Sequence, residues 1–166
     1  MPTKEKRLED LFHEGLKDIY FAEKKILAAL PKMAKAVKSK ELAAAFHKHE
    51  KQTKEHVVRL EKVFEMIDKD PRGKNCPAIT GIIEEGEEIM KEYKGSRALD
   101  AGILASAQAV EHYEIARYGT LRDWARELTL NSAVSALERT LGEEQETDQI
   151  LTELADDIIN QEAEAA

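Results

Sequence analysis

Four stretches of this chain carry apolar side chains at alternating spacings of three and four residues, and each stretch is polar at its centre. The four stretches lie within residues 12–37, 42–67, 104–128 and 133–158. Residues three and four apart share one face of an α-helix, so this spacing predicts the buried side of a long helix. The sequence therefore predicts an all-α protein built from four long helices whose buried faces are polar in the middle.

The polar residues in these buried faces are mostly carboxylates and imidazoles. By stretch, they are Glu23; His49, Thr53 and His56; Glu111 and Glu114; and Glu144 and Thr147. Tyr118 also lies on the third stretch. Ionisable groups are rarely buried unless they are paired or bind a metal, so these positions are the candidate functional site.

The length and net charge of the chain limit the number of domains and the kinds of partner that we expect. The 166 residues carry a formal net charge of -8, which suits one helical domain spanning residues 1–166. We expect no nucleic-acid partner, because phosphate binding requires a basic surface. We also expect no membrane segment, since no run approaches the roughly 20 apolar residues that a spanning helix needs. The basic residues 1–7 lead into an amphipathic stretch and not into a secretory signal, so we predict a cytoplasmic protein.

Turn residues predict where the helices end. We expect helices at about residues 4–37, 39–69, 78–94, 97–129 and 132–162, with Ser96 as a cap, Ser39 after the first helix and Asn131 before the last helix. The short turns make the first two and the last two long helices antiparallel neighbours. The connection at residues 70–77 contains one Gly and two Pro. The predicted fold is an antiparallel four-helix bundle with a long crossover that carries a short fifth helix.

Counting outward from the turns places the polar centres at one height. Antiparallel helices rise by the same ~1.5 Å per residue, so Glu23 should lie opposite roughly residue 54, and Glu114 opposite roughly residue 146. The polar layer should then also be close to Glu50 and Asp148. Which of His49, Glu50, Thr53 and His56 is the ligand from the second helix stays open.

Buried carboxylates need protons, basic partners or a cation, and a metal explains the whole set most simply. The predicted metal ligands are Glu23, His49, Glu50, His56, Glu111, Glu114, Glu144 and Asp148. Oxygen-rich ligands with one or two imidazoles suit iron or manganese better than zinc. The spacing of Glu111 and Glu114 places two carboxylates on one face and predicts two Fe or Mn ions. The alternative is a structural network of hydrogen-bonded carboxylates.

The segments LKDIYFAEKKI, AAAFHKHEKQT, AQAVEHYEIARYGTL and LGEEQETDQILTELA cover most of the chain. They resemble the YciF/YciE-type stress proteins of the DUF892 family, and the helix order resembles the ferritin-like superfamily, with rubrerythrin nearest in ligand pattern. The resemblance implies a ferritin-like bundle in a cytoplasmic bacterial protein that is associated with stress and forms a homodimer. The usual di-iron pattern has two Glu-x-x-His pairs, but here Thr53 and Thr147 stand where those histidines belong.

Two functions are consistent with the sequence. In one, the protein is a di-iron or di-manganese oxidoreductase that handles peroxide, dioxygen or ferrous iron. In the other, it is a metal-free structural or interaction module that dimerises and retains a vestigial site. The single Cys76 is predicted to be a loop thiol, and one cysteine cannot build a rubredoxin-like cluster, so an enzyme of this kind would need a separate electron donor. The sequence identifies no catalytic residue.

Overall fold

The computed structural model describes residues 5–165, and it is helical with no strand among those residues. The elements are α1 (Leu8–Ala36), α2 (Lys40–Met66), α3 (Pro77–Glu92), α4 (Leu99–Glu127), α5 (Asn131–Leu154), a π-helical turn (Ala155–Ile159) and α6 (Asn160–Glu164). The predicted start of the first helix at residue 4 lies outside the described residues. The last predicted helix, 132–162, is divided by the π-helical turn. None of the described helices is both long enough and apolar enough to cross a membrane.

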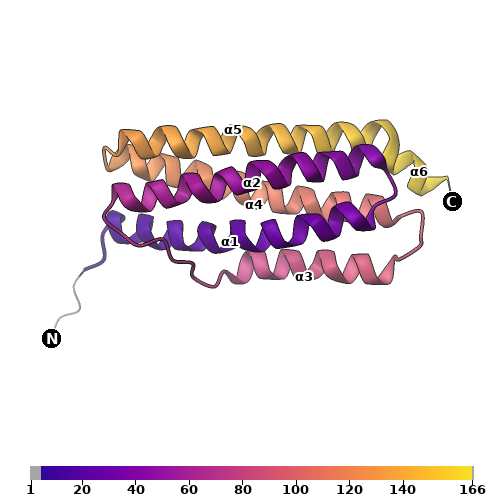
Figure 1. Ribbon diagram of the computed structural model, residues 1–166, viewed down its shortest axis with the longest axis horizontal. Helices are drawn as coiled ribbons and strands as arrows, with labels where there is room; N and C mark the ends of the chain where they lie inside the picture. Colours follow the sequence, from indigo (N-terminus) through magenta and orange to yellow (C-terminus); the bar gives the residue numbers. More distant parts are fainter. Residues whose placement is uncertain (1–4, 166) are drawn as a thin grey trace.

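Four long helices lie side by side, and α3 flanks the bundle (Figure 1). The α1–α2 and α4–α5 pairs are antiparallel hairpins, while α3 packs against α1 and α4. The connection between α2 and α3 runs along α1, where Lys74 N donates to the carbonyl oxygen of Lys17 at 3.0 Å. The predicted ferritin-like bundle, with its crossover and short fifth helix, is confirmed.

Local capping explains two of the helix starts. Ser39 Oγ accepts a hydrogen bond from Leu42 N at 3.1 Å and caps α2. Cys76 precedes Pro77 at the start of α3, and its Sγ accepts from Ile79 N at 3.5 Å. Cys76 is therefore a buried capping residue as well as a loop thiol. Ser96 Oγ accepts from Ala98 N instead of capping α4 directly.

The crossover helix approaches α4 closely because α4 has a glycine at the contact. A Cβ added to Gly102 would lie 2.6 Å from Cγ2 of Ile89. A side chain at this position would push α3 outward. Gly102 therefore sets the distance between the crossover helix and the four-helix core.

Asp100 ties the two halves of the bundle together. This buried carboxylate at the start of α4 accepts hydrogen bonds from Lys38 N at 2.9 Å and from Ser39 N at 2.7 Å, both in the α1–α2 turn. Hydrogen bonds to a charged acceptor are stronger than neutral ones. The carboxylate therefore holds the turn of the first hairpin against the start of the second.

We expect Asp100→Ala to destabilise the protein by about 2–3 kcal/mol, because two backbone donors lose a charged acceptor. Urea unfolding followed by circular dichroism measures the change. Asp100→Asn keeps one acceptor oxygen and should lose less, and exposed Asp156→Ala is the matched control. Equal stability of Asp100→Ala and Asp156→Ala would contradict this role for Asp100.

Candidate metal centre

Halfway along the bundle, the four long helices direct ionisable side chains into one buried layer. The residues are Glu23 from α1, His49 and His56 from α2, Glu111 and Glu114 from α4, and Glu144 from α5, each between 0% and 2% exposed. Apolar residues continue each helix face above and below this layer. The core is thus hydrophobic at both ends and polar at its middle.

The side chains form two groups that share one residue. The first group is His49, Glu111, Glu114 and Glu144, and the second is Glu23, His56 and Glu144. Within each group, one donor atom per residue lies within 4.8 Å of all the others. Glu144 belongs to both groups, so its carboxylate would be shared if each group held an ion.

The donor atoms are close together but are not aligned for hydrogen bonds with one another. His56 Nδ1 lies 2.9 Å from a Glu144 oxygen, and His49 Nε2 lies 3.2 Å from a Glu111 oxygen. Both nitrogens, both oxygens of Glu144 and both oxygens of Glu114 nevertheless lack a hydrogen-bond partner among the described residues. Unpartnered polar atoms are costly in a protein interior. The lack of partners at all of these atoms is consistent with donors that face a common ion.

Each histidine has its second ring nitrogen held from outside the cluster. His56 Nε2 lies 2.9 Å from Glu143, whose carboxylate also accepts from Arg59 at 3.1 Å. His49 Nδ1 lies 3.3 Å from Thr147 Oγ1, which donates to the Glu143 carbonyl oxygen at 3.0 Å and so presents a lone pair to the ring. These contacts hold a proton on the outer nitrogen, so the inner nitrogen is the one that would bind a metal after losing its own proton.

Tyr118 secures the first helix to the cluster. Its buried hydroxyl donates to one oxygen of Glu23, while the other oxygen lacks a partner among the described residues. Burial and the nearby Glu23 raise the pKa of Tyr118 well above its usual value, so the phenol stays protonated as the donor.

Burial and mutual repulsion set the protonation of the metal-free cluster. Burial, together with the charge of Glu144, raises the pKa values of Glu111 and Glu114 well above the usual value for Glu. Burial opposes the charged form of His56, but contacts with Glu144 and Glu23 outweigh it and raise the pKa to about 10. Burial also lowers the pKa of His49. The cluster without metal therefore retains protons that metal ions would displace.

Some predicted ligands lie outside the two groups. Glu50 is at the surface side of α2, where it pairs with Lys54 at 2.8 Å, and Thr53 Oγ1 donates to the His49 carbonyl oxygen. Asp148 pairs with exposed His112 at 3.1 Å. Of the four candidates on the second helix, His49 and His56 reach the cluster, whereas neither Glu50 nor Thr53 joins a group.

Sequence reasoning found Thr147, which contacts His49, but not the side chains that hold His56 from outside the cluster. Glu143 and Arg59 were not predicted, although Arg59 is three residues after His56 and Glu143 is next to Glu144. Their positions on a helix face beside the ligands were the available signal. Thr140 completes this support, since its Oγ1 accepts from Arg59 at 2.6 Å.

The donor set fits a pair of divalent transition-metal ions. Four carboxylates and two imidazoles form a site in which oxygen donors outnumber nitrogen donors, and the described residues give it no thiolate. Oxygen with imidazole suits iron and manganese, whereas closed zinc sites favour sulfur and nitrogen. A four-helix bundle with one long crossover and this layer at mid-height is a ferritin-like protein with a candidate dinuclear centre.

Comparisons with known proteins give the family. The family model described as "Domain of unknown function (DUF892)" matches residues 7–164, and the chain belongs to this family. It is 42% identical over 161 residues to Protein YciF of Escherichia coli strain K12, covering 96% of both chains.

Solved structures agree with the fold. The E. coli stress protein YciF superposes with a TM-score of 0.89 at 39% identity, covering 94% of this chain and 99% of that one. YcfI of Rhodopseudomonas palustris, a proposed structural protein, gives 0.87 at 43% identity, covering 92% and 97%. A protein from Xanthomonas campestris pv. campestris gives 0.73 at 19% identity, covering 96% and 98%, and supports the fold alone.

We expect Glu114→Gln to stabilise the metal-free protein at neutral and alkaline pH. The folded-state pKa of Glu114 is above its unfolded value, so the folded protein binds more protons and its stability falls as pH rises above about 4.5. Gln has no proton to lose. The gain should be about 1–3 kcal/mol at pH 8 and much smaller at pH 5.

Urea unfolding in the presence of a chelator measures the gain in unfolding free energy at pH 8 and at pH 5. Glu50→Gln, on the surface side of α2, is the matched control and should show no such gain. A gain for Glu114→Gln that is equal at both pH values would show that ionisation of Glu114 is not the cause.

Proposed function

We propose that the buried cluster binds two iron or manganese ions and that the protein is a dinuclear oxidoreductase acting on dioxygen, peroxide or ferrous iron. The observation that carries the proposal is the position of Glu144, which is shared by two groups of buried donors. The unpartnered atoms of Glu114, Glu144, His49 and His56 support it.

The two groups divide the ligands between the ions. One ion would be held by His49 Nε2 with Glu111, Glu114 and Glu144, and the other by His56 Nδ1 with Glu23 and Glu144. The four carboxylates balance the four positive charges of two divalent ions, which removes the cost of burying them. A pair of reduced ions would supply two electrons to an oxidant.

The chain's own residues keep this chemistry enclosed. The cluster is at most 2% exposed, so the bundle excludes bulk water from it and strengthens every charge interaction inside. Tyr118 donates to Glu23, and Glu143 accepts from His56, so both are placed to hold or move protons at the second group. Electrons would come from a separate donor.

The competing proposal is a structural module with a vestigial site. The proposed structural role of YcfI favours it, and the protonated state of the metal-free cluster could persist without ions. Metal content separates the two proposals directly, because a vestigial cluster binds no stoichiometric metal.

A role in stress, a cytoplasmic location and a homodimer complete the proposal. YciF of E. coli is described as a stress protein, which supports the stress role by similarity. The exposed large apolar residues Leu11, Val58, Met66, Tyr93 and Ile158 are distributed over several elements. These residues do not define one dimer surface, so the homodimer stays a prediction. Sedimentation equilibrium measures the oligomeric state.

We expect about two ions per chain after anaerobic loading with ferrous iron, measured by elemental analysis. Glu144→Gln should lose most of both ions because it removes the shared ligand. Glu23→Gln should lose mainly one ion. Glu50→Gln, which changes a carboxylate outside both groups, should bind as the wild type does. Full loading of Glu144→Gln would contradict the proposed bridge, and no loading of the wild type would favour the structural module.

Metal affinity should increase with pH. Metal ligands must be deprotonated, and the raised pKa values of Glu111, Glu114 and His56 mean that each group would release a proton on binding. Competition with a chelator of known affinity at pH 6, 7 and 8 measures the trend, after correction for the chelator's own protonation. An affinity independent of pH would show that these groups are not ligands.

A further inference from the structure

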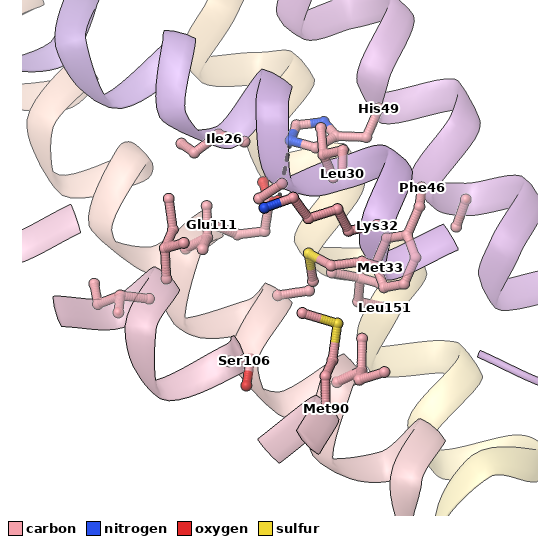
Figure 2. A pocket seen from close by; sticks show the side chains of 18 of the residues that line it. Ile26, Leu30, Lys32, Met33, Phe46, His49, Met90, Ser106, Glu111 and Leu151 are labelled. Carbon is pink, nitrogen blue, oxygen red and sulfur yellow. Dashed lines mark ion pairs between the residues drawn. The ribbon is translucent and has the colours of Figure 1, made fainter. Parts of the chain in front are cut away.

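A narrow apolar pocket leads to one side of the buried carboxylate and histidine cluster. It has a volume of about 30 Å³ and lies where α1, α3 and α4 meet, with α2 and α5 closing its inner end. Figure 2 shows Met33 and Met90 in the middle of the view, with Phe46 and Leu151 nearby. Most of the lining side chains are hydrocarbon or thioether.

The two ends of the pocket differ in exposure. At the outer end, Lys32 and Glu87 form an ion pair of 3.2 Å with side chains 63% and 48% exposed. At the inner end are His49 and Glu111, each 2% exposed and both in the first ligand group (Figure 2). The lining therefore extends from the surface beside α3 to the donors of the candidate centre.

Size and polarity limit what this pocket can hold. About 30 Å³ is room for one or two very small molecules, and apolar cavities of this kind stay dry. Hydrogen peroxide would lose its hydrogen bonds to water along an apolar wall, and this loss costs free energy. Dioxygen is small and apolar, so it loses no hydrogen bonds on entry.

We propose that this pocket is a dioxygen site that delivers the gas to the His49–Glu111 side of the cluster. Reduction of this dioxygen rests on the proposed metal centre. Dioxygen, and not peroxide, is the oxidant that enters through this pocket. Two ferrous ions would each lose one electron. Dioxygen would gain both electrons and two protons and leave as hydrogen peroxide.

Flexible side chains form part of the pocket wall. Met33 from α1 and Met90 from α3 both line the pocket, and methionine is unbranched and adapts its shape easily. The crossover helix is mostly half-exposed along this face, so its side chains move with less resistance than those of the four-helix core.

Xenon is a suitable probe because it binds dry apolar cavities and needs no metal. We expect a xenon site in the pocket in crystals of the metal-free protein under xenon pressure. Two variants should remove it by filling the space: Ala29→Leu from α1 and Ile83→Trp from half-exposed α3. Ala28→Leu, the exposed neighbour of Ala29, is the matched control and should keep the site. Absence of xenon from the wild-type pocket would overturn the inference.

The second experiment follows oxidation of the ferrous-loaded protein by stopped-flow absorbance. The filling variants should slow oxidation by dioxygen by about tenfold, equivalent to about 1.4 kcal/mol of added activation free energy. Oxidation by hydrogen peroxide should be unchanged, as should both rates in Ala28→Leu. Circular dichroism and metal content verify that each variant is folded and loaded.

The outcomes separate this inference from the proposed function. Equal slowing with both oxidants, or no slowing with either, would overturn the dioxygen route while leaving the metal centre intact. A wild-type protein that binds no iron would overturn the proposed function. In that case the xenon result alone decides whether the pocket is a gas site.

Discussion

The cost of burying charge governs this bundle. Four carboxylates lie within one layer of the core, almost fully removed from water, and so many negative charges cannot remain together without protons or cations. In the metal-free protein, raised pKa values at Glu111 and Glu114 keep protons there. Two divalent ions would satisfy the same electrostatic need. The same side chains must therefore be compatible with both the protonated, metal-free cluster and the proposed metal-bound cluster.

The cluster also makes the bundle sensitive to helix register. A slip of one residue moves a side chain by about 1.5 Å along the helix and about 100° around it, which would remove a donor from the layer. Links between helices lie both at the site, where Tyr118 of α4 donates to Glu23 of α1, and at the end of the first hairpin. Asp100 accepts hydrogen bonds from the α1–α2 turn and holds it against α4. Gly102 has no side chain, which allows α3 to pack closely against the same helix. The functional layer thus depends on contacts made several turns away.

Helical periodicity was sufficient to predict the fold and most residues of the layer. Glu23, Glu111, Glu114 and Glu144 were found because each interrupts an otherwise apolar face. Periodicity could not choose among His49, Thr53 and His56, which share one face of α2, or exclude Glu50 beside them, because only packing determines which side chains reach the cluster. It also could not find the Asp100 link or the Glu143–Arg59 pair, because these depend on contacts between helices distant in sequence.

The two sides of the cluster have different surroundings, and the difference suits a redox centre. Around the second ligand group are hydrogen-bonding partners, namely the Tyr118 hydroxyl, which donates to Glu23, and the Glu143 carboxylate, which accepts from His56 and Arg59. Beside the first group, at His49 and Glu111, is the apolar pocket. In the proposed centre, protons and an apolar oxidant would therefore arrive from different directions. A single wet channel could not make this distinction, because water would fill it and peroxide would enter as readily as dioxygen.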